Sequence, residues 1–267
     1  MTAIETDADG GARERAFLGV SALVFLTSAA ATISWSRSMA GGVPLPGGWA
    51  LSMAWMKMPG QTWLAAAAGF LGMWMVMMVA MMLPSLVPVL SSYRRSVRSR
   101  EETPVGRLTT VASAGYFFVW AVYGGLAYAL GVIVTGAELR WSTLARLGPV
   151  ATGVVLVLAG AFQLTAWKSR QLVRCWEALG NGWSSAPDAR STWHYGVRLG
   201  TRCSLCCSGF MVLLLVTGMM RLGTMALVAA AITLERLARR PERVARAAGV
   251  VVLAAGGLVL ARALGAA

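Results

Sequence analysis

Charged residues are scarce in this chain of 267 residues: 13% are Asp, Glu, Lys or Arg, whereas 57% are hydrophobic. Because soluble domains carry about 25% charged residues, the composition excludes an ordinary soluble protein and predicts an integral membrane protein. Acidic residues number only 11, and the net charge is +13. The basic residues gather in short stretches between apolar runs, which is typical of membrane loops and argues against nucleic-acid binding.

Other absences narrow the function. The two lysines, Lys57 and Lys168, lie at or beyond the ends of apolar runs, which excludes a retinal protein. No P-loop is present, so any transport would be passive or ion-coupled, and the few charges within the runs argue against a proton-coupled pump. The one histidine, His194, stands among aromatic residues and is interpreted as an interfacial side chain. We expect a protein that is not an enzyme and has no catalytic residues.

The apolar runs predict an all-α fold, a polytopic transmembrane bundle of about seven spans. A disordered tail (1–12) is expected before a single transmembrane domain (13–267) with spans at 16–35, 63–90, 108–135, 148–167, 203–217, 222–237 and 244–264. Residues 203–237 would measure about 52 Å as one helix, too long for one crossing, so a turn near 218–223 is expected. Residues 169–202 are interpreted as a long loop, partly along the membrane surface. The first run resembles a signal peptide, but an uncleaved span is favoured because similar runs follow.

The orientation follows from the positive charges. With seven spans, 18 of the 24 basic residues fall on the side of the N-terminus, in the tail and in 91–107, 168–202 and 236–246. This bias predicts a cytoplasmic N-terminus in a bacterial inner membrane. All four cysteines then lie near the reducing cytoplasmic face, where structural disulfides are not expected and free thiols or metal ligation are favoured.

A cysteine-rich segment is the first candidate site. On a helix, Cys203, Cys207 and Met211 recur at i, i+4 and i+8, with Cys206 one turn from Cys203. Thiols and a thioether on one face form a soft donor set, suited to Cu(I) and less well to Zn(II). The alternative is that these residues only pack against neighbouring helices.

A methionine-rich face in the second span is the other candidate. Met77 and Met81 share one face and Met82 lies beside them, so their thioethers offer a path for a soft cation, although adaptable packing is the commoner role of such a face. Pro84 and Pro88 are expected to interrupt the helical hydrogen bonds near the end of this span.

Three ordered motifs resemble a bacterial family of predicted metal-binding integral membrane proteins of unknown function. Trp74-Met-Val-Met-Met-Val-Ala80-Met-Met-Leu-Pro84-Ser85 resembles its WxxMxxAMMxPS signature. Ala159-Gly-Ala-Phe-Gln163 with Lys168 is similar to AGxYQxxxxK, and Gly196 to Cys207 is similar to GxxxGxxCxxCC. Leu234-Glu235-Arg236 also matches. The resemblance implies an inner-membrane protein with a metal site; a further family cysteine after the lysine is Gln171 here, which leaves Cys175 as the fourth thiol.

The sequence therefore predicts a protein of the lipid bilayer that binds or transfers a soft metal ion, with copper favoured. The expected partner is a metal donor or acceptor protein. The expected ligands are Cys203, Cys206, Cys207, Met211, Cys175, Met77, Met81 and Met82. Two alternatives remain: an accessory or structural membrane subunit without metal, and a thiol-redox protein using Cys203 and Cys206.

Overall fold

The computed structural model describes residues 2–38, 43–45, 49–51, 57, 60–98, 105–180, 188–219, 221–238 and 240–265. These residues form eight helices: α1 (Thr2–Ser38), α2 (Trp63–Arg98), α3 (Val105–Arg140), α4 (Ser142–Gln163), α5 (Ala166–Gly180), α6 (Ala189–Thr217), α7 (Leu222–Leu237) and α8 (Pro241–Gly265). A small antiparallel hairpin, β1 (Val43–Leu45) and β2 (Trp49–Leu51), joins α1 to α2. The predicted helical fold is confirmed.

Six stretches of the described chain are long and apolar enough to cross a membrane. They are Gly11–Ser38, Trp63–Val97, Val105–Arg140, Arg146–Gln163, Ala189–Thr217 and Pro241–Gly265. The predicted span 222–237 corresponds to α7, which has 16 residues. At about 24 Å, it is shorter than the hydrocarbon core of about 30 Å and is not one of the six.

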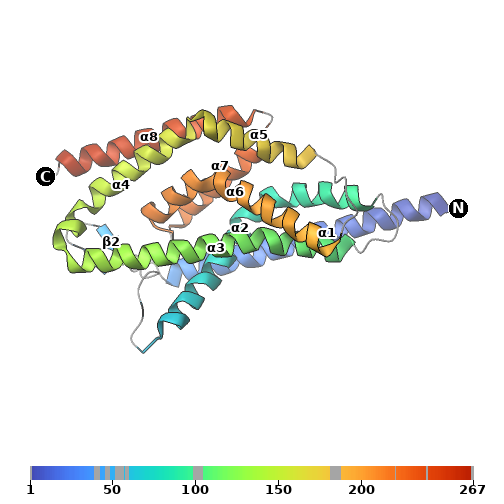
Figure 1. The fold of residues 1–267 in the computed structure, drawn as a ribbon, viewed down its shortest axis with the longest axis horizontal. Helices are drawn as coiled ribbons and strands as arrows, with labels where there is room; N and C mark the ends of the chain where they lie inside the picture. The colour runs from blue at the N-terminus through green and yellow to red at the C-terminus, as the bar shows by residue number, and fades with distance from the viewer. Residues whose placement is uncertain are drawn as a thin grey trace.

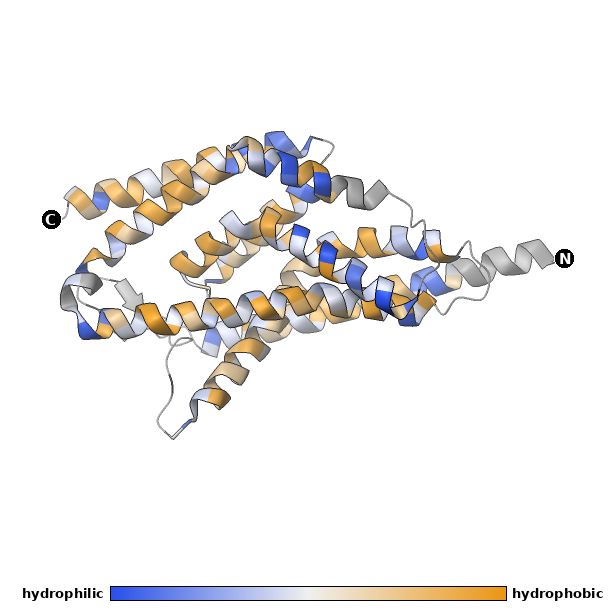
Figure 2. Cartoon of the chain, viewed as in Figure 1, coloured by the Kyte–Doolittle hydropathy of each residue, from blue (hydrophilic) through white to orange (hydrophobic). Residues whose placement is uncertain are grey.

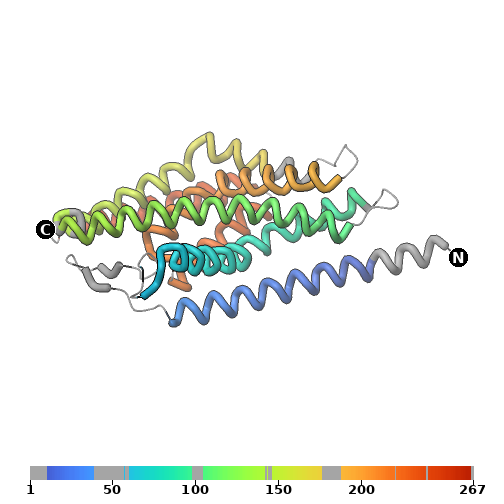
Figure 3. Tube along the Cα trace, turned by 60° about the horizontal axis from the view of Figure 1, so that its bottom comes forward, coloured from blue at the N-terminus to red at the C-terminus, as the bar shows by residue number. Residues whose placement is uncertain are grey.

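The helices run back and forth along the long axis of the molecule, and the two termini lie at opposite ends (Figures 1 and 3). Apolar residues cover most of the helical length, and polar residues gather near helix ends (Figure 2). Helix α1 lies against α2 and leaves most of its apolar side chains exposed. The predicted tail, residues 1–12, falls at the start of α1, largely outside the part of the chain whose side chains are described.

Two sequence-based boundaries are wrong. The predicted span 148–167 ends earlier, because α4 stops at Gln163 and the chain turns at Leu164 and Thr165. The predicted loop 169–202 instead contains most of α5 and the first half of α6, with 181–187 outside the described residues. Basic residues are compatible with helices, and the basic residues of 169–202 that the structure describes lie in α5 and α6 rather than in a loop.

Of two further local expectations, the turn near residue 218 is confirmed and the interruption at the two prolines is not. The chain turns between α6 and α7 at Gly218, whose φ of 98° favours glycine. Helix α2, however, continues through Pro84 and Pro88 to Arg98 rather than ending near them.

Close helix contacts bring the candidate site together. A Cβ added to Gly200 of α6 would come within 2.8 Å of the Tyr116 carbonyl oxygen of α3, and one added to Gly196 would collide with the Ala112 carbonyl. Glycine at these positions lets the two backbones meet, as small residues do in membrane helix pairs. Gly124 likewise makes room for the ring of Trp74, whose Nε1 donates to the Trp120 carbonyl at 2.9 Å.

Candidate metal centre

Helix α6 presents the cysteine segment to the protein interior. The Asp188 carboxylate accepts a hydrogen bond from the Ser191 backbone N–H at 3.0 Å and so caps the start of the helix. Further along, Cys203, Cys206, Cys207 and Met211 are all buried. The Cys203 and Cys207 sulfurs are 3.9 Å apart, so the predicted shared face is present for this pair.

Helix α3 closes over this face. The Tyr116 hydroxyl is fully buried and donates to the Cys203 sulfur at 3.0 Å. The close approach of α3 to α6 at Gly196 and Gly200 makes this contact possible, since a larger side chain would hold the helices apart.

Helix α5 supplies the fourth thiol. Cys175 lies in the same buried core cluster as the three cysteines of α6. All four cysteines are free and buried. Residues from two helices that are about thirty positions apart in the sequence therefore meet as one thiol cluster, defined here as Cys175, Cys203, Cys206 and Cys207.

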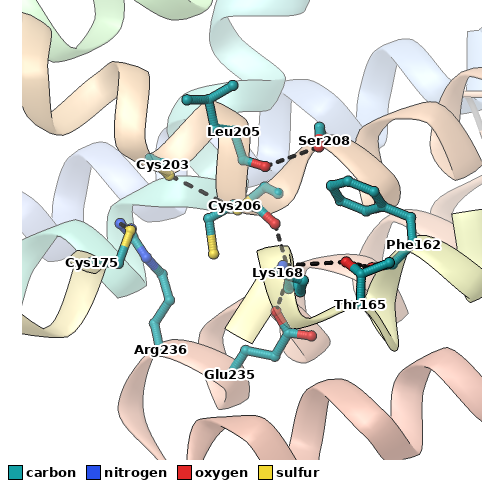
Figure 4. Close-up of polar contacts among 11 residues, drawn as sticks. Phe162, Thr165, Lys168, Cys175, Cys203, Leu205, Cys206, Ser208, Glu235 and Arg236 are labelled. Atoms are coloured by element: carbon teal, nitrogen blue, oxygen red, sulfur yellow. Dashed lines mark hydrogen bonds and ion pairs between the residues drawn. The ribbon is translucent and has the colours of Figure 1, made fainter. Parts of the chain in front are cut away.

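A buried ion pair lies beside the thiol cluster. Lys168 Nζ donates to the Glu235 carboxylate at 2.8 Å and to the Cys206 carbonyl at 2.6 Å (Figure 4). It also lies 5.3 Å from the centre of the Phe210 ring. The side chains of Lys168 and Glu235 are 0% and 1% exposed. The turn after α4 directs Lys168 inward. At this turn Thr165 Oγ1 accepts a hydrogen bond from the Lys168 backbone N–H at 3.3 Å, and α5 begins.

A second buried cation, Arg236, is adjacent to Glu235 on α7. Its Nη1 donates to Ser85 Oγ at 3.0 Å and its Nη2 lies 3.8 Å from the Cys175 sulfur (Figure 4). Ser85 is held in turn by donating to the Met82 carbonyl at 2.9 Å. The guanidinium is placed to offset the negative charge of a Cys175 thiolate, which is the form that binds metal.

The predicted methionines belong to the same interior. Met77, Met81, Met82 and Met211 are buried in one core cluster with the four cysteines. The structure thus brings the eight predicted ligands into one region, from α2, α5 and α6.

The four thiols do not already surround a single point. Among the described residues, no three or more His, Cys, Asp or Glu side chains already have the spacing of a metal site. The pair Cys203 and Cys207 nevertheless fits one ion: with metal–sulfur bonds of about 2.3 Å, as for zinc, two thiolates on one ion stand about 4.0 Å apart in trigonal and about 3.8 Å apart in tetrahedral geometry. Their 3.9 Å separation matches this range.

Sequence reasoning missed the polar groups around the thiols. Glu235, which the sequence shows only as part of a family motif, pairs with Lys168 in the interior. Tyr116 lies in the predicted span 108–135, and no motif marks it. The available signal was that Ser85, Lys168, Glu235 and Arg236 all fall within the motifs that carried the family resemblance.

Gln163 belongs to the second of the three family motifs. Its amide is buried near Gly209 and Gly249 at the end of α4. Neither amide atom has a hydrogen-bond partner among the described residues.

Comparisons with known proteins agree with a metal-related role. A search of curated proteins and a search of solved structures found no match. The family model PpoB2, described as copper chaperone, matches residues 71–259. This range is more than half of the chain and includes the thiol cluster, the buried ion pair and the methionine-rich part of α2. The chain therefore belongs to the PpoB2 copper chaperone family.

Proposed function

We propose that this protein is a non-catalytic copper carrier of a bacterial inner membrane that holds Cu(I) on Cys thiolates and exchanges it with a donor or acceptor protein. The observation that carries the proposal is the thiol cluster, four free and buried cysteines next to Tyr116 and Arg236 in a chain of the copper chaperone family. Soft sulfur ligands prefer Cu(I), and Cys203 with Cys207 has the spacing of two thiolates on one ion.

The cationic groups favour thiolates in a buried place. Two or three thiolates around one Cu(I) leave a net negative charge, which is costly to bury without compensation. Arg236 lies beside Cys175, and Lys168 is bonded to the Cys206 carbonyl. Both cations are buried, so they offset this charge without water.

The methionine thioethers extend the proposed site. Met211 follows the cysteines on α6, and Met77, Met81 and Met82 line the same core from α2. A thioether is a neutral, weaker ligand than a thiolate, so these residues suit transient contact with an ion in transit.

The membrane arrangement is part of the proposal. Six membrane-length helices support insertion, and α7, which returns against α6 between the turn at Gly218 and Leu237, adds a seventh, short crossing. The termini at opposite ends of the molecule support an odd number of passes (Figure 1). With the basic loops inside, the N-terminus is cytoplasmic.

Metal content tests the proposal. Detergent-purified protein, made under reducing conditions with added copper, should contain about one Cu(I) per chain by mass spectrometry. The C203S/C207S variant should lose it, and M211L should bind more weakly. M75L is the control, because Met75 lies on α2 but is only partly buried and is not a proposed ligand.

Size-exclusion profiles identify variants that fail to fold. Negligible copper in folded wild-type protein would contradict copper binding and favour an accessory subunit without metal. Unchanged stoichiometry in C203S/C207S would contradict this assignment of ligands.

A further inference from the structure

A carrier with buried ligands needs a place where the ion can reach them. Three thiols of the cluster, Cys203, Cys206 and Cys207, are at most 1% exposed, while Cys175 is 7% exposed. Tyr116 covers Cys203 directly. Any exchange with a partner molecule must therefore begin at Cys175 or require the helices to separate.

Cys175 lines a small pocket where α2, α5 and α7 meet. The other lining residues are Ser85, Val89, Leu172, Glu235, Arg236 and Leu237. The volume open to the centre of a water molecule is about 10 Å³, which suits one water or one metal ion. Leu237, at the end of α7, is 52% exposed and marks the outer side of this pocket.

Glu235, one of the residues that line the pocket, has a carboxylate that is only partly satisfied. Glu235 is 1% exposed, and its Oε2 is bound by Lys168, whereas its Oε1 has no hydrogen-bond partner among the described residues. Figure 4 shows Cys175 beside the Arg236 guanidinium, with Glu235 on the neighbouring position of the same helix. An unpartnered carboxylate oxygen in the interior is costly, so a water or a cation beside Glu235 would stabilise it.

The thiols continue inward from this pocket. The four cysteines lie in one buried cluster, and the sulfurs of Cys203 and Cys207 are 3.9 Å apart. A Cu(I) ion that binds Cys175 therefore has further sulfur ligands within the same cluster.

We propose that the pocket lined by Cys175, Glu235, Arg236 and Leu237 is the port through which Cu(I) reaches and leaves the thiol cluster, with Cys175 as the first protein ligand. This inference rests on the proposed function. The substrate is a Cu(I) complex of a small thiol or of a partner's cysteine. The thiol that carries the ion stays at the outer side of the pocket, beside Leu237, because the pocket holds only one ion.

The exchange is balanced without any change of oxidation state. A bond forms between Cu(I) and the Cys175 sulfur, and the bond between Cu(I) and the carrier's sulfur breaks. The proton of the Cys175 thiol passes to the released carrier thiolate. Arg236 acts as a positioning residue that holds the Cys175 sulfur in the pocket.

Blocking the mouth tests the port without removing a ligand. Leu237→Trp enlarges the side chain at the pocket, while Leu234→Trp is the matched control, since Leu234 is 59% exposed on the same helix and does not line the pocket. Proteins are loaded from Cu(I)–glutathione, and the ion is then removed with bathocuproine disulfonate. We expect L237W to slow both loading and removal about tenfold with unchanged stoichiometry and affinity, and L234W to exchange at the wild-type rate.

A second readout needs no copper. Methyl methanethiosulfonate, a small thiol reagent, should modify Cys175 of the metal-free protein first, more slowly in L237W and equally fast in L234W, as followed by peptide mass spectrometry. Modification of Cys203, Cys206 or Cys207 as fast as Cys175 would overturn the port, as would wild-type exchange rates in L237W. Wild-type protein with a reactive Cys175 but no copper uptake would instead overturn the proposed function, and with it the role of the pocket as a copper route.

Discussion

The buried pair of Lys168 and Glu235 should respond strongly to the loss of one partner. Lys168→Met keeps the length of the side chain but removes the ammonium group that holds Glu235 Oε2 at 2.8 Å and the Cys206 carbonyl at 2.6 Å. Glu235 would remain as an unpaired charge that is 1% exposed. Breaking a buried pair in this way costs about 3–5 kcal/mol.

The corresponding fall in Tm is about 6–20 °C, since a chain of this size loses about 2–4 °C per kcal/mol. The measurement is thermal unfolding in detergent, followed by circular dichroism and tryptophan fluorescence. The double variant K168M/E235M should recover most of the loss, because removing both charges leaves no unpaired group. Lys57→Met is the control, since Lys57 is exposed near Trp63.

Two results would refute this reasoning. A Tm of K168M within about 2 °C of the wild type would mean that Glu235 tolerates the loss, through water or through neutralisation. A double variant less stable than either single variant would mean that packing of the two side chains, and not their charge, stabilises this region.

Three further changes test other parts of the structure. Gly196→Val should force α3 away from α6 and cost about 1–3 kcal/mol in thermal unfolding, whereas Gly125→Val, with open space around it, should be close to neutral; equal effects would contradict the close contact. Tyr116→Phe removes the hydrogen bond to Cys203 and should cost about 0.5–1.5 kcal/mol, measured in the same way, and an unchanged Tm would show that this bond contributes nothing. Hydrogen bonds from the first turn of α6 hold the pKa of Asp188 below its usual value. The ionised carboxylate therefore stabilises the fold above about pH 4, and this stabilisation is lost as the pH falls through the pKa of Asp188 in the folded state. Asp188→Ala should flatten the decrease of Tm at low pH, and an unaltered profile would exclude this role.

Much of the fold follows from hydropathy. Apolar runs and the glycine at position 218 were sufficient to predict the long helices and the turn after Thr217, because backbone groups in an apolar environment must bond within a helix. The errors came where charges and helix coincide: α5 is rich in Arg and Lys, so its residues were interpreted as loop. The seventh span remains a prediction, since α7 falls short of membrane length.

The sequence alone determined the nature of the donor set. The spacing of Cys203, Cys206, Cys207 and Met211 places soft ligands on one helix, whatever that helix contacts, because helical periodicity is local. The same holds for the methionines of α2. Family motifs pointed to a metal-related protein, and the match to the copper chaperone family agrees.

Only the tertiary structure decided what surrounds the thiols. Contacts between Lys168 and Glu235, between Arg236 and Cys175, and between Tyr116 and Cys203 join positions that are 61 to 87 residues apart. Such contacts depend on which helices pack together and at what rotation, and these depend on close approaches such as that of Gly196 to α3. Hydropathy is a property of single residues and short windows, so it carries no information on these pairings. It predicts which segments are buried, whereas the packing of the helices determines which polar groups meet inside.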